Sequence, residues 1–296
     1  NGNVPSVTRC VVDGAGTGIV AFGTDAVITH NVVRLARSDV GIGVNGSNAL
    51  IQKNVVEDAH GTLVFCSGNS ARILQNKLAN SRTKPGIEVG GLDVIVQKNV
   101  VRSTFSAGIH VLGGGAEILD NDVRDTHVID PAIVNSAASD GRMIHNRVRD
   151  ALSSGLAYVG NTATVRNNRI ERCGAALGHG PALIVLAAGS EISGNVVIDS
   201  RHDGINVSGD DVTLTKNVVR RSILDGFDIV GHDMLVTDNV AIENHGEGFE
   251  VNALGGTFRK NVAKSNRIDI AVTAPLAIFD ANTYSTGGPI TVPEVN

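Results

Sequence analysis

The sequence predicts an all-β solenoid, in which short strands coil repeatedly around one continuous core. Three observations support this fold class. The pentapeptide QKNVV occurs at 52–56 and again at 97–101, with close copies elsewhere. Asparagines recur about every 22 residues, the signature of a repeat architecture. Finally, the 296 residues are 42% hydrophobic but only 3% aromatic, with 35 glycines, which favours regular layers of Val, Ile and Leu.

The repeat is marked by asparagine at the start of the step N-[VKDR]-[VLI]. Successive members are 21 to 27 residues apart, and most spacings are 22 or 23. Cys10 occupies the same slot one coil earlier. The positions are Asn31, Asn54, Asn76, Asn99, Asn121, Asn146, Asn168, Asn195, Asn217, Asn239, Asn261 and Asn282.

Each repeat contains three short β-like segments. One precedes the asparagine, as at 50–52 (LIQ), one follows it, as at 32–34 (VVR), and one follows a glycine, as at 86–89 (GIEV). They are rich in Val and Ile and are bounded by Gly, Asp, Asn and Ser. No segment with helical periodicity interrupts them. Stacked coils would form three parallel sheets, and parallel crossovers strongly favour a right-handed turn.

The sequence therefore predicts a single-domain right-handed parallel β-helix of about 12 coils over residues 1–296. It begins inside the repeat pattern, as expected for a chain trimmed at its N-terminal end. We expect the repeated asparagines to point inward and form a ladder. Each side-chain amide can donate to one neighbouring coil while its oxygen accepts from the other.

A second inward column is predicted five residues after the ladder, where every residue is small. Its members are Ala36, Ala59, Ser81, Thr104, Thr126, Ala151, Cys173, Ser200 and Ser222. The three cysteines have no metal-ligand spacing and are interpreted as small apolar fillers.

Composition excludes several partners. The net charge is −5 and no Lys/Arg run is present, which argues against nucleic acid. No segment approaches ~18 apolar residues, so membrane insertion is not expected. The oligomeric state is left open by the sequence.

With the repeat, the three-strand coil and the asparagine column in place, the chain from Cys10 to Asn282 resembles the pectate-lyase-like superfamily of right-handed β-helices. That group includes pectate lyases, polygalacturonases, alginate lyases, mannuronan C5-epimerases and phage tailspikes. The resemblance implies a secreted or periplasmic protein that acts on an acidic polysaccharide. Because one scaffold carries all these activities, function must be argued from residues outside the core.

Two coils are longer than the rest, with spacings of 25 residues after Asn121 and 27 after Asn168. The extra residues fall in 126–134 and 173–185, and insertions on one side of a solenoid often mark its binding face. Our first hypothesis places a catalytic set beside them. It assumes that a one-residue bulge in GLAYV (155–159) turns a tyrosine outward. The set is His110, Tyr158, His127 and His179.

This set suits proton abstraction α to a carboxylate, which needs a base, a proton donor and a group that stabilises the developing enolate. The leading hypothesis is therefore a uronate-polymer lyase or C5-epimerase. Substrate binding is assigned to Glu88, Arg124, Arg149 and Arg172. The resemblance adds Asp130 as a catalytic residue, since 130–131 match the start of the epimerase motif Asp-Pro-His, although alanine stands third.

Two acidic columns in later coils support a different site. Asp203, Asp225 and Glu247 precede the corner glycine of three successive coils, and Asn206, Asp228 and Glu250 follow on the outward strand position. Ca²⁺ takes six to eight oxygen ligands. We expect a Ca²⁺ site formed by Asp225, Asp228, Glu247 and Glu250, with a screened acidic surface as the alternative.

Two other functions compete with the lyase or epimerase hypothesis. The segments 202–207 (HDGINV), 208–212 (SGDDV) and 178–180 (GHG) are similar to polygalacturonase motifs, although their order differs from that family's. This favours a glycoside hydrolase. Most coils also carry few loop residues, which is compatible with a non-catalytic carbohydrate-binding or architectural protein.

Overall fold

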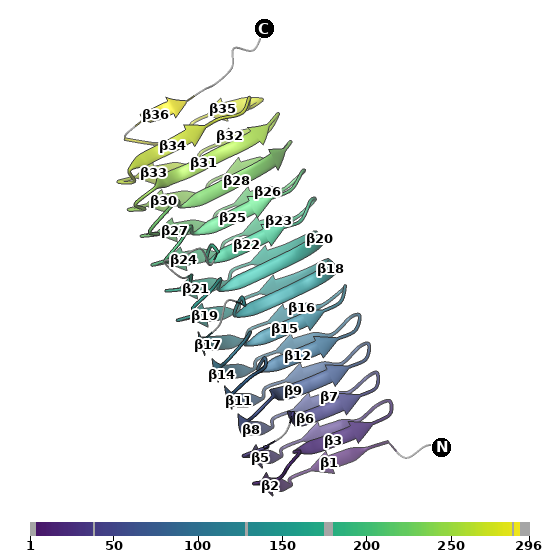
Figure 1. Ribbon diagram of the computed structural model, residues 1–296. Helices are drawn as coiled ribbons and strands as arrows, with labels where there is room; N and C mark the ends of the chain where they lie inside the picture. The colour runs from purple at the N-terminus through teal and green to yellow at the C-terminus, as the bar shows by residue number, and fades with distance from the viewer. Residues whose placement is uncertain (1–3, 38, 128–129, 175–179, 286, 291–296) are drawn as a thin grey trace. The chain divides into compact units, whose positions relative to one another are not determined.

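The computed structural model describes residues 4–37, 39–127, 130–174, 180–285 and 287–290. The chain divides into two compact units, residues 1–152 and 153–296. In each unit, successive coils of parallel strands stack on one another (Figure 1). The described residues form no α-helix, and they therefore contain no helix that could cross a membrane. The single-domain prediction stays a prediction.

The first unit repeats three strands per coil. The strands before the ladder asparagine are β1 (Ser6–Thr8), β4 (Val27–Thr29), β7 (Leu50–Gln52), β10 (Arg72–Leu74), β13 (Ile95–Gln97) and β16 (Glu117–Leu119). The strands after it are β2 (Val11–Asp13), β5 (Val32–Arg34), β8 (Val55–Ala59), β11 (Lys77–Ser81), β14 (Val100–Thr104), β17 (Asp122–Thr126) and β19 (Arg147–Arg149). The third strands are β3 (Ile19–Phe22), β6 (Val40–Asn45), β9 (Thr62–Ser67), β12 (Ile87–Gly90), β15 (Ile109–Leu112) and the long β18 (Ile133–Ile144).

The second unit has the same plan. Its long β20 (Leu156–Arg166) supplies both a third strand and the next strand before the asparagine. The other strands before the asparagine are β23 (Glu191–Ser193), β26 (Thr213–Thr215), β29 (Leu235–Thr237), β32 (Thr257–Arg259) and β35 (Ile278–Asp280). The strands after it are β21 (Arg169–Glu171), β24 (Val196–Ile198), β27 (Val218–Arg220), β30 (Val240–Ile242) and β33 (Val262–Lys264). The third strands are β22 (Leu183–Leu186), β25 (Ile205–Ser208), β28 (Phe227–His232), β31 (Glu247–Leu254), β34 (Ile268–Val272) and β36 (Gly287–Ile290).

Strands pair with their counterparts one coil away, always in parallel. Ile51 of β7, for example, is in register with Ile73 of β10, which is in register with Val96 of β13. Among the described residues, 12 strands follow a ladder position or its Cys10 equivalent. The predicted all-β parallel solenoid of about 12 coils is therefore confirmed.

The asparagine ladder is confirmed inside each unit. Asn76 shows the pattern: its Nδ2 donates to Ile51 O at 2.9 Å and to Asn99 Oδ1 at 3.0 Å, while its backbone N–H donates to the same Oδ1 at 2.9 Å. The residue before the ladder adopts a left-handed conformation, as at Lys53 and Lys98, with φ of 55° and 56°. This single-residue bend turns the next side chain inward, where its polar atoms meet the neighbouring coils.

The column of small residues is also buried, with at most 5% of any member exposed. In the last coils it becomes a second polar ladder that the sequence analysis did not anticipate. Asn244 Oδ1 accepts from the backbone of Ser222 at 2.9 Å, and Asn244 Nδ2 donates to Asn266 Oδ1 at 2.8 Å. Asn266 Nδ2 in turn donates to the fully buried Asp269 at 2.9 Å. The signal was present, because asparagine replaces the small residues at both positions.

The cysteines fit the filler interpretation in two of three cases. Cys66 and Cys173 are buried, and burial raises the pKa of Cys66 to about 11. Cys10 is exposed in the first coil, so its interpretation as a buried filler is wrong.

Close packing at the corners holds the third strands in place. A Cβ at Gly204 would lie 2.2 Å from Val219 Cγ1 and 2.6 Å from the Gly226 carbonyl, so only glycine fits there. Behind the next two strands, the rings of Phe227 and Phe249 stack with centroids 4.6 Å apart. This apolar stack fixes β28 and β31, which carry outward carboxylates.

Candidate functional site

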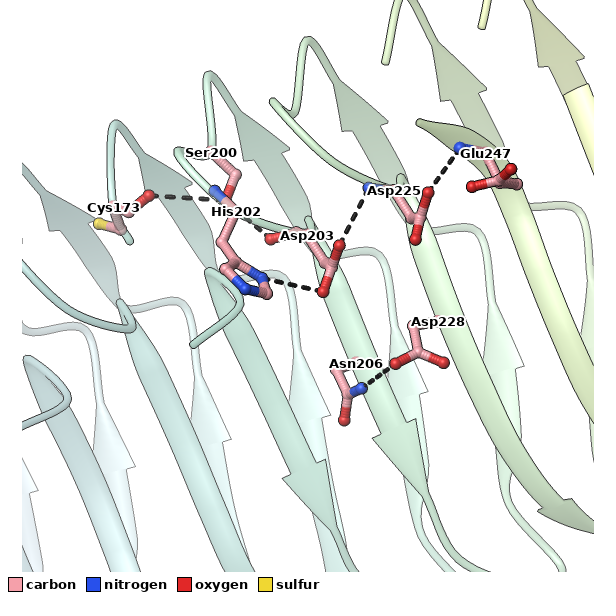
Figure 2. Close-up of polar contacts among 8 residues, drawn as sticks. All are labelled: Cys173, Ser200, His202, Asp203, Asn206, Asp225, Asp228 and Glu247. Carbon is pink, nitrogen blue, oxygen red and sulfur yellow. Dashed lines mark hydrogen bonds and ion pairs between the residues drawn. The ribbon is translucent and has the colours of Figure 1, made fainter. Parts of the chain in front are cut away.

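The strongest cluster of ionisable groups lies in the second unit, on β25, β28, β31 and the corners before them (Figure 2). Asn206, Asp228 and Glu250 occupy matching positions on adjacent strands. Asp203 and Asp225 stand at the corners of β25 and β28, and Glu247 begins β31. The predicted acidic columns therefore exist as neighbouring rows.

The corner row is linked through its backbone. Asp203 Oδ1 accepts from the Asp225 N–H at 3.0 Å, and Asp225 Oδ1 accepts from the Glu247 N–H at 2.5 Å. A Cβ at position 246 would lie 2.1 Å from Asp225 Oδ1, so Gly246 makes room for this carboxyl. Each acidic side chain is thereby aimed along the row toward the next coil.

A histidine and an arginine stand at the two ends of the corner row. His202 Nδ1 lies 2.9 Å from Asp203 Oδ2, and Arg267 Nη2 lies 2.7 Å from Glu247 Oε1. Ser200 Oγ donates to the Asp203 carbonyl at 2.7 Å and holds this corner closed. The central carboxyl, Asp225, has acidic neighbours on both sides.

This arrangement separates the protonation states of two neighbouring carboxyls. Burial, followed by its hydrogen bond with Glu247, raises the pKa of Asp225 to about 8. The hydrogen bond from Asp225, followed by the charge of Arg267, holds the pKa of Glu247 below its usual range. At neutral pH, Asp225 therefore keeps its proton while Glu247 is ionised.

In the outward row, the pKa values of the two carboxyls are raised, as is that of Asp225. Burial and then the charge of Asp203 raise the pKa of Asp228, while the hydrogen bond from the Asn206 amide opposes this shift. Partial burial and then the charge of Asp228 raise the pKa of Glu250. The cluster thus contains one carboxyl, Asp225, whose pKa lies near neutral pH, beside two whose pKa values are raised by burial, and this suits acid–base chemistry.

Calcium binding stays a prediction. The described residues contain no group of three or more His, Cys, Asp and Glu side chains arranged to hold a metal ion. Asp225, Asp228, Glu247 and Glu250 do supply the oxygen donors that Ca²⁺ prefers. However, Asp225 retains a proton and turns one oxygen to the backbone, and both features disfavour coordination by that residue.

In the first unit, His110 lies on β15 in register with Glu88 of β12. Both side chains are partly exposed, as predicted for the outward position. His110 Nε2 lies 3.4 Å from Ser136 Oγ, and Glu88 Oε2 accepts from Thr62 Oγ1 at 3.4 Å. The structure therefore brings His110 and Glu88 together on one sheet.

The insertion of the first unit places two more predicted residues at the surface. His127 and Asp130 are exposed, and the Asp130 carboxylate accepts a hydrogen bond from Ser106. The intervening residues 128 and 129 lie outside the described residues.

The predicted arginines belong to a different sheet from His110. Arg124 and Arg149 are paired in register on β17 and β19, the strands that follow the ladder asparagine. Arg149 Nη2 also lies 3.1 Å from Asp122 Oδ1. A corner of the coil separates these two strand types, and the assignment of the arginines to substrate binding stays a prediction.

Tyr158 is buried, which corrects the prediction that it faces outward. Its hydroxyl donates to the carbonyl oxygens of Asn161 at 2.9 Å and Thr162 at 3.2 Å. The strand has no bulge there: Ala157 pairs with Ile184 in the outward row, and Tyr158 takes the inward position next to it. A side chain in the core cannot reach a polysaccharide.

The remaining predicted residues lie in the second unit. Arg172 is exposed, with φ of 53° at the turn after β21. His179 lies outside the described residues. Asp210 and Asp211, from the polygalacturonase-like segment, are exposed at a turn, where Asp210 pairs with His232 Nδ1 at 2.8 Å. This segment therefore forms an exposed turn.

Comparisons with known proteins agree with the fold. Residues 1–147, 41–183, 79–219 and 132–286 each match the family described as the right handed beta helix region. No curated protein sequence matches the chain.

Several solved structures are similar over most of the chain. A mutant of the periplasmic alginate epimerase AlgG is 14% identical with a TM-score of 0.54, over 93% of this chain and 74% of the epimerase. The Dettilon tailspike protein is 14% identical with a TM-score of 0.55, over 90% of this chain and 62% of the tailspike. The catalytic domain of a GH87 alpha-1,3-glucanase is 11% identical with a TM-score of 0.52, over 97% of this chain and 61% of the glucanase. At these identities the likeness concerns the fold alone.

Proposed function

The chain belongs to the family of right-handed β-helix proteins, and on that basis we propose that it is a polysaccharide-active enzyme that hydrolyses glycosidic bonds at the acidic cluster of its second unit. The observation that carries this proposal is the corner row Asp203–Asp225–Glu247, whose members are linked carboxyl to backbone and in which burial and the hydrogen bond with Glu247 raise the pKa of Asp225 to about 8. Solved structures of similar fold include an alpha-1,3-glucanase and an alginate epimerase, which supports a polysaccharide substrate. A secreted or periplasmic location is part of the proposal.

The chemistry needs one carboxylic acid and one carboxylate. Asp225 is assigned as the general acid that gives its proton to the glycosidic oxygen as the bond to the anomeric carbon breaks. Asp228 is assigned as the base that takes a proton from the attacking water, because burial raises its pKa and so its basicity, and the Asn206 amide donates a hydrogen bond that orients its carboxylate. Glu247 is a positioning residue, since its negative charge and hydrogen bond keep the proton on Asp225.

The test is the release of reducing ends from a panel of α-1,3-glucan, polygalacturonate and alginate. Asp225→Asn and Asp228→Asn should each lower turnover at least about 100-fold, the usual contribution of an acid or base. Asp238→Asn is the matched control, because Asp238 is exposed at a turn on another corner. Full turnover in Asp225→Asn, or no hydrolysis of any polymer by the unaltered protein, would refute the assignment.

A uronate lyase or C5-epimerase is the second candidate, and the pairing of His110 with Glu88 on one exposed sheet favours it. In this reaction His110 would abstract the proton α to the substrate carboxylate. The assay is the absorbance of unsaturated uronate products and the ratio of C5 epimers. Activity lost in His110→Gln but kept in Asp225→Asn would select this candidate over hydrolysis.

A further inference from the structure

One corner of the first unit carries a row of two arginines, a histidine and a phenylalanine that the proposed chemistry does not use. The row lies six residues after the ladder asparagine, where the chain turns toward the third strand of each coil. In four successive coils its members are Arg37, His60, Arg82 and Phe105. They stand at the corners between β5 and β6, β8 and β9, β11 and β12, and β14 and β15 (Figure 1).

Backbone hydrogen bonds show that this row is stacked. The His60 N–H donates to Ala36 O at 2.9 Å, and the Arg82 N–H donates to Ala59 O at 3.1 Å, so each residue sits directly one coil from the last. Parallel strands are ~4.8 Å apart. The two arginines, Arg37 and Arg82, are therefore about 10 Å apart along the stack, with the histidine between them.

The first three members of the row line an open cleft of about 240 Å³. Its lining residues are Leu35, Ala36, Arg37, Asp58, His60 and Arg82. Asp58 is the acidic member, and its carboxylate already accepts a hydrogen bond from Asn80 at 3.0 Å.

The two arginines of the cleft have free hydrogen-bonding capacity. Across the described residues, no carboxylate lies within ion-pair distance of Arg37, Arg82 or the adjacent Lys84. Two other exposed arginines of this unit do have ion-pair partners, since Arg34 pairs with Glu57 and Arg142 pairs with Glu117. Unpaired arginines along one line are suited to carboxylate groups, which they bind through planar pairs of N–H donors.

The row ends on an exposed aromatic ring. Phe105 follows Arg82 in the next coil, and 47% of its surface is accessible. An exposed aromatic ring beside charged groups is typical of a binding surface, because contact with a ligand removes its apolar face from water.

We propose that this row, the basic corner, binds a carboxylated polysaccharide chain. A linear polymer with regularly spaced carboxylates can follow the stack, placing anions on Arg37 and Arg82 and the apolar face of a sugar ring on Phe105. A single small anion would use only one cation and leave the ring uncovered. The basic corner is independent of the acid–base site, so it goes beyond the proposed hydrolysis and also holds for a protein that only binds.

The test measures binding of polygalacturonate by isothermal titration calorimetry, with the Asp225→Asn variant so that no hydrolysis occurs. The double variant Arg37→Gln/Arg82→Gln should bind at least about tenfold more weakly, since each arginine makes a charged hydrogen bond. The matched control is Arg34→Gln/Arg142→Gln, which removes the same charge from the same unit and should bind almost normally. Phe105→Ser should weaken binding without changing its dependence on salt.

The outcomes separate the alternatives. Equal binding of the carboxyl-reduced polymer would overturn the proposal, because the carboxylates would then contribute nothing. An equal loss in the control double variant would overturn it too, since only net charge would matter. Tighter binding of single-stranded DNA than of polygalacturonate would replace the polysaccharide with nucleic acid. These binding measurements do not require hydrolysis, so a negative hydrolysis assay would not change how they are interpreted.

Discussion

Replacing one rung of the buried asparagine ladder should destabilise the protein far more than the same change at the surface. Asn99 is fully buried, and its side chain makes four hydrogen bonds. Its Oδ1 accepts from the Asn76 backbone N–H at 2.9 Å and from Asn76 Nδ2 at 3.0 Å. Its Nδ2 donates to Ile73 O at 2.8 Å and to Asn121 Oδ1 at 3.1 Å.

Asn99→Leu keeps the side-chain volume but removes all four contacts. Two donors of Asn76 then lose an acceptor in a buried environment, and each unsatisfied donor costs about 1–3 kcal/mol. The free energy of unfolding should therefore fall by about 2–6 kcal/mol. This corresponds to a Tm lower by at least roughly 4 °C for a chain of this size.

The assay compares urea and thermal unfolding midpoints of Asn99→Leu with those of Asn45→Leu. Asn45 is exposed at the end of β6 and makes a side-chain bond only with Ser67 among the described contacts. Because repeat proteins unfold in segments, the comparison uses the midpoint of the first transition. Equal midpoints for the two variants would show that the ladder contributes little and would refute the reasoning.

Three further predictions concern the second unit. Raising the pH from about 4 to about 8 should lower the Tm, because the pKa of Asp225 is raised in the folded protein and the unfolded chain loses this proton at lower pH. Asp225→Asn should flatten this decline. An unchanged dependence of Tm on pH in the variant would contradict the assignment. Millimolar Ca²⁺ should raise the Tm, and Asp228→Asn should abolish most of this rise. If Ca²⁺ does not change the Tm of the unaltered protein, the carboxylates form an acidic surface without a Ca²⁺ site. Tyr158→Phe should cost about 1–2 kcal/mol of unfolding free energy, through the lost bonds to Asn161 and Thr162, and leave turnover unchanged. Loss of turnover at unchanged stability would argue against this structural role.

The sequence alone determined the fold because the same local pattern recurs in every coil. An asparagine such as Asn54 cannot be buried singly without a partner, so its recurrence about every 22 residues implies a stack in which each rung satisfies the next. The glycine before the third strand carries comparable information, since at Gly204 no Cβ fits. The acidic rows were predictable for the same reason, as Asp225 and Glu247 occupy equivalent places in adjacent repeats.

The direction of individual side chains was harder to predict. A shift of one residue in strand register exchanges the inner and outer faces. The pairing of Ala157 with Ile184 therefore places Tyr158 in the core, although the motif GLAYV read alone allowed the opposite. The relation of Arg124 to His110 was open for a similar reason, because the repeat pattern does not say that their strands belong to different sheets.

Only the tertiary structure decided the chemistry of the acidic cluster. The proton on Asp225 depends on burial behind the corner and on Glu247 from the next coil, two effects that no single repeat contains. The cleft of the basic corner likewise arises because Arg37 and Arg82, 45 positions apart in the chain, are stacked with one coil between them. Periodicity reports which residues are equivalent, whereas pKa values and binding surfaces depend on distances between coils, which exist only once the chain has folded.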